Sequence, residues 1–287
     1  MKKRLIQIFL IILLILIFLY SDYLIKNIID YTQLFINNLF FYMFIIYIIS
    51  SLLVDYDLLS SINPIFFVTL MSLISGFPSG AKYTKELLDK DYITDDIAKY
   101  LVTYTHYPNP LFILGSVSML VGKSNSICIL LSIYFSSFIT SRFFKAKKRN
   151  YQASISNIPK LVTSLNKAIN NTLKTIILVY GTSIISLIIG LLVVRVFHPQ
   201  NIIYSLIFGL FDLTKGIFST AIIRNKRISC ILILLFINVG SLSIHMQVKS
   251  ILNSNNLYKK YLVGRLLSTI VSVFSFDIIH SLMGILY

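Results

Sequence analysis

Of the charged or titratable side chains in apolar stretches of this sequence, where a charge is costly without a partner, three stand out. Asp212 lies in the middle of one stretch, His245 follows a strip of glycine and serine, and Arg265 lies near the start of the last stretch. Asp212 is suited to binding a proton or a sodium ion, or to pairing with Lys215. His245 can titrate near neutral pH, although a hydrogen-bonded structural histidine is the commoner case, and Arg265 can hold a carboxylate or pair with an acid.

A turn rich in helix breakers precedes a further cation. Gly76, Pro78 and Gly80 stand within five residues, and Lys82 follows them. Such a turn leaves backbone N–H groups free to face an anion, and Lys82 would add a positive charge. The alternative is that Lys82 extends its ammonium group to the aqueous surface. The sequence leaves both interpretations open.

No familiar catalytic or metal-binding pattern accompanies these residues. The sequence has no His-Glu-x-x-His, no phosphate-binding loop, no Gly-x-Ser-x-Gly and no cysteine cluster. Cys128 and Cys230 both lie inside apolar runs and are expected to be small buried hydrophobic residues. We therefore expect neither an enzyme, nor a metal site, nor a cofactor other than a coupling Na⁺ or H⁺.

The composition identifies the medium in which these residues act. The chain has 287 residues, of which 56% are hydrophobic and 13% charged, whereas a soluble domain carries about 25% charged residues. A chain of this kind is expected to be an all-α polytopic membrane protein, with room for about 7–9 membrane segments. The net charge of +15 is attributed to cytoplasmic loops and lipid headgroups rather than to nucleic acid.

The first part of the chain contains two long apolar stretches and a short one. The stretch 5–20 follows a basic start without a cleavage site, so we expect an uncleaved crossing with its N-terminus in the cytoplasm. The stretch 34–54 is long enough to span. The short stretch 62–75 ends at the glycine–proline turn, so we expect it to enter the membrane and turn back. Asp95 and Asp96 mark the start of a later helix.

The rest of the chain alternates broken and unbroken apolar stretches. Two prolines interrupt the stretch 100–121, and the basic loop 145–160 is the clearest cytoplasmic marker. We expect an amphipathic surface helix over 155–171, followed by a span over 172–197. Further apolar stretches cover 202–223, 228–246 and 261–287.

Four interrupted places recur in the same order on each side of the basic loop. A breaker cluster at 76–82 and a broken helix at 106–110 come before it, and 211–216 and 238–247 come after it. This order favours two repeats, each with an interrupted hairpin followed by an unwound helix, as in transporters that bind solute at such interruptions. The expected substrate-binding residues are Gly76, Pro78, Ser79, Gly80, Lys82, Asn109, Pro110, Asp212, Thr214, Gly240, Ser241, Ser243, His245, Gln247 and Arg265.

The repeats define the expected organisation of the chain. The expected units are N-terminal membrane helices over 1–60, a first transport repeat over 61–145, a basic cytoplasmic loop with a surface helix over 146–171, and a second transport repeat over 172–287. The bilayer is the expected partner. A homo-oligomer is compatible with the sequence but not required by it.

The interrupted segments resemble a known family. Residues 76–82 (Gly-Phe-Pro-Ser-Gly-Ala-Lys), 109–115 (Asn-Pro-Leu-Phe-Ile-Leu-Gly), 212–216 (Asp-Leu-Thr-Lys-Gly) and the box 240–252 are similar to motifs of the YlbJ family of sporulation integral membrane proteins. That family belongs to the nucleoside-recognition, or Gate, domain membrane proteins. The resemblance covers roughly residues 60 to 275. Departures include Val239-Gly240 in place of Gly-Gly and a shorter chain.

The resemblance implies a fold and a substrate. The fold would be similar to that of concentrative nucleoside transporters, with two re-entrant hairpins and two broken helices, in the cell or forespore membrane of a spore-forming bacterium. The substrate would be a small organic anion, dipicolinic acid, and replacing Lys82 or Arg265 would then reduce its uptake. Two alternatives stay open: a nucleoside-like solute coupled to Na⁺ or H⁺, and a non-transporting sporulation scaffold that recruits partners through the basic loop.

Overall fold

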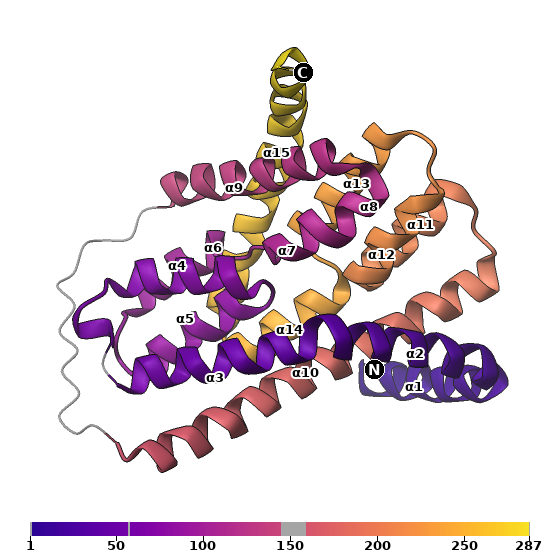
Figure 1. Ribbon diagram of the computed structural model, residues 1–287. Coiled ribbons are helices and arrows are strands. Elements are labelled where there is room, and N and C mark those ends of the chain that lie inside the picture. The colour runs from indigo at the N-terminus through magenta and orange to yellow at the C-terminus, as the bar shows by residue number, and fades with distance from the viewer. Residues whose placement is uncertain (1, 57, 145–158, 287) are drawn as a thin grey trace.

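The computed structural model describes residues 2–56, 58–144 and 159–286. Every regular element within these ranges is a helix, as the composition predicts (Figure 1). Residues 145–158, which hold most of the basic loop and the start of the expected surface helix, lie outside the described residues.

The chain begins with two helices that meet at a sharp bend. Helix α1 (Lys2–Leu19) and helix α2 (Ser21–Phe35) lie at 90° to each other. Helix α2 continues through the π-helical segment η1 (Ile36–Phe40) into α3 (Phe41–Asp55). The first expected crossing is therefore a separate helix, and the second is the end of a longer helical segment that starts before it.

A short helical hairpin follows, as the breaker cluster predicts. The 3₁₀ turn η2 (Leu58–Ser60) leads to α4 (Pro64–Ser75), which Gly76 ends with a φ of 75°. Helix α5 (Ser79–Asp89) then runs back against α4. The helix resumes at Ser79, inside the breaker cluster 76–82, so Gly80 is helical. A glycine fits there because a Cβ on it would collide with the carbonyl oxygen of Thr105.

The next helix is broken at the predicted prolines. Helix α6 (Asp95–Tyr104) starts at the predicted acids, and an irregular segment, 105–109, separates it from α7 (Pro110–Phe112). The Asn109 side chain caps α7 by accepting a hydrogen bond of 2.8 Å from the backbone N–H of Leu111. The chain continues through the π-helical segment η3 (Ile113–Val117), α8 (Ser118–Val121) and α9 (Lys123–Phe143).

The second half starts with a single long helix. Helix α10 (Leu161–Phe197) has 37 residues and is about 55 Å long at 1.5 Å per residue. It replaces the separate surface helix and span expected from the sequence. Its apolar residues continue the amphipathic segment without a breaker, so nothing ends the helix between them.

A second hairpin and a second broken helix complete the chain. Helices α11 (Asn201–Phe211) and α12 (Leu213–Ser219) are separated by Asp212 alone, and η4 (Thr220–Ile222) follows. Helix α13 (Lys226–Val239) ends at Gly240, which has a φ of 82°, and α14 (Leu242–Leu252) and α15 (Asn255–Leu286) follow. The helices thus break at the places where polar and breaker residues predict interruptions.

The two hairpins open toward opposite ends of the molecule. At one end, the Tyr56 hydroxyl donates a hydrogen bond of 3.3 Å to the carbonyl of Pro159, just before α10. At the other end, α10 leads into α11 (Figure 1). The hairpin α4–α5 therefore opens beside the start of α10, and the hairpin α11–α12 opens beside its end. Helix α15 crosses α6, α9 and α13 between them.

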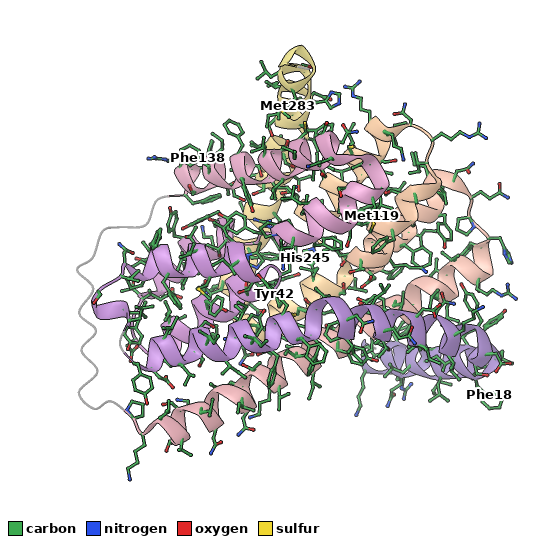
Figure 2. The ribbon with its side chains drawn as sticks, viewed as in Figure 1. Phe18, Tyr42, Met119, Phe138, His245 and Met283 are labelled. Atoms are coloured by element: carbon green, nitrogen blue, oxygen red, sulfur yellow. The ribbon has the colours of Figure 1, made fainter. Side chains whose placement is uncertain are left out.

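The lengths and exposure of the helices match an integral membrane protein. In the described part of the chain, four helices are long and apolar enough to cross a membrane, or five if the bent pair α1–α2 counts as one crossing. Large apolar side chains such as Phe18 and Phe138 lie on the outside (Figure 2). Cys128 and Cys230 are buried free thiols, as expected. The expected count of 7–9 segments is not reached by length alone, because α4, α7–α8 and α11 are short apolar helices.

Candidate functional site

A pocket of about 330 Å³ lies where the turns of both hairpins meet both broken helices. We call it the central pocket. Its lining residues are Tyr31, Leu34, Phe35, Leu39, Met43, Ser75, Gly76, Phe77, Pro108, Asn109, Phe112, Ser116, Met119, Val179, Ser183, Asp212, Leu213, Thr214, Phe218, Ser243, Ile244 and Gln247. A volume of this size suits a small ligand.

Asp212 forms the charged part of the pocket wall. It is 1% exposed and is the N-cap of α12. Its Oδ1 accepts a hydrogen bond of 2.9 Å from the backbone N–H of Lys215, and its Oδ2 accepts one of 3.1 Å from the Tyr31 hydroxyl. The Lys215 ammonium group does not pair with it and lies over the Phe208 ring, 5.8 Å from the centroid. Asp212 is therefore held by neutral donors and not by the ammonium group of Lys215.

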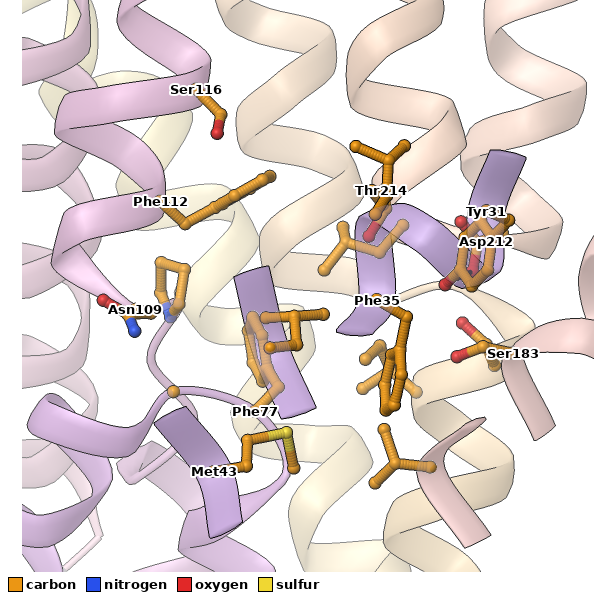
Figure 3. A pocket seen from close by; sticks show the side chains of 18 of the residues that line it. Tyr31, Phe35, Met43, Phe77, Asn109, Phe112, Ser116, Ser183, Asp212 and Thr214 are labelled. Atoms are coloured by element: carbon orange, nitrogen blue, oxygen red, sulfur yellow. Dashed lines mark hydrogen bonds between the residues drawn. The ribbon is translucent and has the colours of Figure 1, made fainter. Parts of the chain in front are cut away.

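Polar side chains continue the wall on both sides of Asp212. The Ser243 hydroxyl interacts with the Asp212 carboxylate and lies 2.7 Å from the hydroxyl of Ser241. The Gln247 Nε2 donates a hydrogen bond of 3.2 Å to the Ser183 hydroxyl, while the buried Gln247 Oε1 has no partner. Figure 3 shows Ser183 and Thr214 on the same side of the pocket as Asp212. This side of the pocket is rich in oxygen atoms that accept hydrogen bonds.

The remaining walls are mainly aromatic and aliphatic. Phe35 and Met43 come from the α2–α3 segment, Phe77 from the turn of the first hairpin and Phe112 from α7. Asn109 and Ser116 add polar atoms opposite Asp212 (Figure 3). Flat rings on several sides favour a flat or aromatic ligand, because they bury its faces while the polar groups fix its orientation.

The structure separates the predicted site residues into two groups. The pocket is lined by Gly76, Asn109, Asp212, Thr214, Ser243 and Gln247. The remainder lie outside its lining: Pro78, Ser79, Gly80, Lys82, Pro110, Gly240, Ser241, His245 and Arg265. Of these, Ser79 bonds the carbonyl of Gly76, so it supports the turn from behind. Among the described residues, no lysine or arginine side chain lines the pocket.

Lys82 is part of a charged network between α3 and α5. Its ammonium group lies 3.2 Å from Glu86 Oε2 and sits over the rings of Tyr47 and Tyr83, 4.8 and 4.6 Å from their centroids. Lys90 lies 3.0 Å from Glu86 Oε1 and 2.8 Å from Asp55 Oδ1. Lys82 therefore neither extends to the surface nor faces the pocket. Its contacts fix the first hairpin to α3.

The network controls the protonation of Glu86, which lies outside the candidate membrane spans. Burial raises the pKa of the Glu86 carboxyl, but the charges of Lys82 and Lys90 act in the opposite direction and hold it at about 2. Burial lowers the pKa of Lys90, while Glu86 and Asp55 raise it, with a net rise. Glu86 and Lys90 are therefore charged at neutral pH.

Arg265 closes the end of the first broken helix. It is 2% exposed, and its Nη1 and Nη2 donate to the carbonyl oxygens of His106 and Thr103 at 3.1 and 3.4 Å. The last carbonyls of a helix have no partners within the helix, and a cation is favourable there. A Cβ on the neighbouring Gly264 would collide with the backbone of Thr103, so α15 and α6 are in close contact at this point.

Sequence reasoning missed the residues that α2, α3 and α10 contribute to the pocket. Tyr31 is in the polar stretch 30–33, which separates the first two apolar runs and gave a weak signal. Ser183 lies in an apolar run that forms one continuous helix, so only the packing of α10 against α14 reveals its position. Phe77 belongs to the predicted cluster 76–82 and Phe218 to the apolar stretch 202–223, and the sequence does not indicate that their rings line a site.

Comparison with known proteins gives one informative match. No family model matches the sequence, and no solved structure matches it. The curated "sporulation integral membrane protein YlbJ" of Bacillus subtilis (strain 168) is 24% identical over 248 residues, which is 70% of this chain and 60% of that protein. The chain thus spans about 60% of the length of its relative.

The match agrees with the motifs at the four interruptions and with the apolar helices of the structure. The relative, the motifs and the apolar helices all indicate a membrane protein. The chain is an integral membrane protein, and it is distantly similar to the sporulation integral membrane protein YlbJ of Bacillus subtilis.

Proposed function

We propose that the chain is a membrane transporter for a small aromatic solute, which binds in the central pocket. The observation that carries this proposal is the meeting of four interruptions at one cavity: Gly76, Asn109, Asp212 and Ser243 each come from a different one. Transporters with inverted repeats bind solute between such interruptions. Hairpins that open toward opposite ends of α10 support two inverted repeats, and we propose a transporting rather than a catalytic role.

The first candidate solute is dipicolinic acid, the organic anion that the family resemblance implies. Its flat ring suits the aromatic walls formed by Phe35, Phe77 and Phe112. The relative's name connects it with sporulation, and we propose the same setting for this chain, in the cell or forespore membrane. Because Asp212 adds a negative charge to the pocket, a dianion would have to enter with a proton or metal cation, or meet a positive group close to the pocket.

A nucleoside-like solute is the second candidate. Asp212 and the hydroxyls of Tyr31, Thr214 and Ser243 form a polar wall suited to the hydroxyl and amide groups of a neutral solute. Asp212 could also carry the coupling H⁺ or Na⁺. The scaffold hypothesis concerns the basic loop, most of which lies outside the described residues, and no observation on the described residues favours it.

Uptake by reconstituted protein tests the proposal. Proteoliposomes with the purified chain are given labelled dipicolinate or labelled uridine, with and without a Na⁺ or H⁺ gradient. Accumulation of either solute above protein-free liposomes supports transport and identifies the candidate. If neither solute accumulates and neither raises the melting temperature of the chain in detergent, the central pocket is not a site for these solutes.

A further inference from the structure

A second polar group lies beside the central pocket, where both broken helices meet α15. We call it the histidine–arginine cluster, and its side chains are His106, His245, Tyr258, Tyr261 and Arg265. The Tyr261 ring is central, with its centroid 4.5 Å from that of His106 and 5.7 Å from that of His245. Figure 2 shows His245 near the middle of the molecule, far from the outer side chains Phe18 and Met283.

The cluster contains a buried positive charge without a counter-charge. Among the described residues, no carboxylate lies within ion-pair distance of Arg265. The carbonyls of Thr103 and His106 carry only partial negative charge. A buried guanidinium is costly unless its charge is compensated, so the site favours an anion.

Several polar atoms of the cluster have no partner. They are the Arg265 Nε, the Tyr261 hydroxyl and both ring nitrogens of His106. The side chains of Tyr261 and His106 are 0% and 1% exposed, so bulk water does not reach them. The Arg265 Nε–H can only donate a hydrogen bond, and the Tyr261 hydroxyl carries a proton that it can donate. A neutral His106 adds one ring N–H as a third donor. Buried donors without acceptors mark the place of a missing acceptor.

One of these free groups, the Tyr261 hydroxyl, faces Gly240, which has no side chain. Gly240 has a φ of 82°, and the position that its Cβ would occupy lies 3.3 Å from the Tyr261 hydroxyl and 3.6 Å from the His245 Nε2. The same turn starts the 11-residue helix α14, whose first backbone N–H groups have no side-chain cap. Helix N-termini favour anions. His245 is held in place by the Tyr258 hydroxyl, 3.1 Å from its Nδ1.

We infer that the turn at Gly240, the Tyr261 hydroxyl and the Arg265 guanidinium form a binding site for a compact anion, such as a carboxylate group. The site adjoins the central pocket on two sides. Ser243 and Ile244 of the same turn line the pocket. The ring of Phe77 lines it as well, and its centroid is 6.4 Å from that of His106. A solute in the pocket can therefore direct a carboxylate to the site, and this step alone rests on the proposed function.

Tyr261→Phe tests the site because it removes the free hydroxyl and keeps the ring. Without a ligand, the change removes an unpartnered buried group, so it leaves the melting temperature unchanged or raises it. The purified full chain is titrated in detergent with sodium acetate, sodium chloride and dipicolinate, and the melting temperature is followed. We expect anion-dependent stabilisation of the wild type and about tenfold weaker apparent affinity in Tyr261→Phe.

Tyr47→Phe is the matched control. Tyr47 is also fully buried with an unpartnered hydroxyl, but it packs on Tyr83 and Lys82, outside the cluster. The anion effect should be unchanged in this variant. Equal anion effects in the wild type and in Tyr261→Phe, or no anion effect at all, would overturn the inference.

The three anions show whether the site binds a carboxylate of the solute or a free inorganic anion. Weaker dipicolinate binding in Tyr261→Phe supports a carboxylate of the solute. If only chloride gives a Tyr261-dependent effect, the anion site is upheld and its link to the solute is refuted. Because the readout is binding, a chain that binds anions but fails to accumulate any solute would refute the proposed function and leave this inference standing.

Discussion

The hydroxyl of Tyr31 donates a hydrogen bond of 3.1 Å to the Asp212 carboxylate, across 181 positions of the sequence. The bond joins α2 to the turn of the second hairpin. It is formed at the wall of the central pocket, where Thr214 and Ser183 also lie. A proton, a cation or a solute that binds to Asp212 must compete with this bond or share the carboxylate with it. We therefore expect the position of α2 to depend on what binds in the pocket.

Because we propose that Asp212 carries the cation or proton that accompanies the solute, Asp212→Asn should reduce solute uptake at least tenfold while leaving the fold intact. Asparagine keeps the size of the side chain and is as good an N-cap as aspartate, so the bond to the backbone of Lys215 is preserved. The change removes the negative charge and replaces the oxygen that accepts from the Tyr31 hydroxyl with an NH₂ group. A tenfold loss corresponds to about 1.4 kcal/mol. Uptake into proteoliposomes and the melting temperature are measured together. Wild-type uptake in this variant would mean that Asp212 serves only to cap α12.

Tyr31→Phe separates the hydrogen bond from the charge. The ring stays in place, and the carboxylate keeps its bond to the Lys215 backbone. We expect a smaller loss of uptake than in Asp212→Asn, because one neutral hydrogen bond contributes about 1 kcal/mol. An effect larger than that of Asp212→Asn would show that the bond, not the charge, is required.

The charged network of α5 should stabilise the fold without taking part in uptake. Glu86→Gln leaves the buried ammonium of Lys82 unpaired, and breaking a buried pair costs about 3 kcal/mol. Lys82→Met should cost less, because Glu86 keeps Lys90 as a partner. Uptake per folded molecule should be retained in Lys82→Met, since Lys82 does not line the pocket. Loss of uptake without loss of stability would return Lys82 to a role in the site.

The same network predicts a pH dependence of stability. The folded state holds the pKa of Glu86 at about 2, below its ordinary value of 4.5. Its contribution is therefore complete above about pH 5 and is lost as the pH falls through 4.5 toward 2. The difference in melting temperature between wild type and Glu86→Gln should narrow as the pH is lowered from 6 to about 3. A constant difference over this range would contradict the assignment.

The interruptions were predictable because their causes are local. Gly76, the prolines at 108 and 110, and Gly240 each act on their own backbone, and the helices end beside them. Asp212 was marked by the cost of a charge in an apolar stretch, and it lines the pocket. The breaks and the acid could therefore be found without knowledge of the packing.

The partners of the charged residues were not predictable, because they come from distant elements. From its turn, its charge and the family resemblance, the sequence offers Lys82 to a solute anion or to the surface, and Arg265 to an anion or to an acid. The structure places Lys82 against Glu86 and two tyrosine rings, and Arg265 against the carbonyls of the first broken helix. The continuous helix α10 likewise depends on the absence of a breaker, which is a weaker signal than its presence.

Close contact between helices should make Gly264 intolerant of even a methyl group. A Cβ there would collide with the backbone of Thr103, which cannot move as a flexible side chain can. Gly264→Ala should therefore lower the melting temperature and separate α15 from α6. Gly181→Ala in α10 is the control, because a Cβ at Gly181 meets no atom within 4 Å. Alanine is the better helix former, so this variant should be at least as stable as the wild type. Equal stability of the two variants would contradict the close contact.

The opposite openings of the hairpins make a prediction about membrane sidedness. Lys226 donates a hydrogen bond of 2.6 Å to the carbonyl of Leu120, so the start of α13 and the end of α8 lie at one face. Asp89, at the open end of the first hairpin, lies at the other face, near Asp55 and Lys90.

Single cysteines replacing Lys226 and Lys123 should react with a membrane-impermeant reagent from the same side, and a cysteine replacing Asp89 from the opposite side. All three positions are exposed, and Cys128 and Cys230 are buried and can be replaced by serine in the background. The basic residues near 226 would then face the side opposite to Arg142 and Lys160, against the usual preference of positive charge for the cytoplasm. If cysteines at positions 226 and 89 are instead labelled from the same side, the segment α11–α12 crosses the membrane. The two hairpins would then not form inverted repeats.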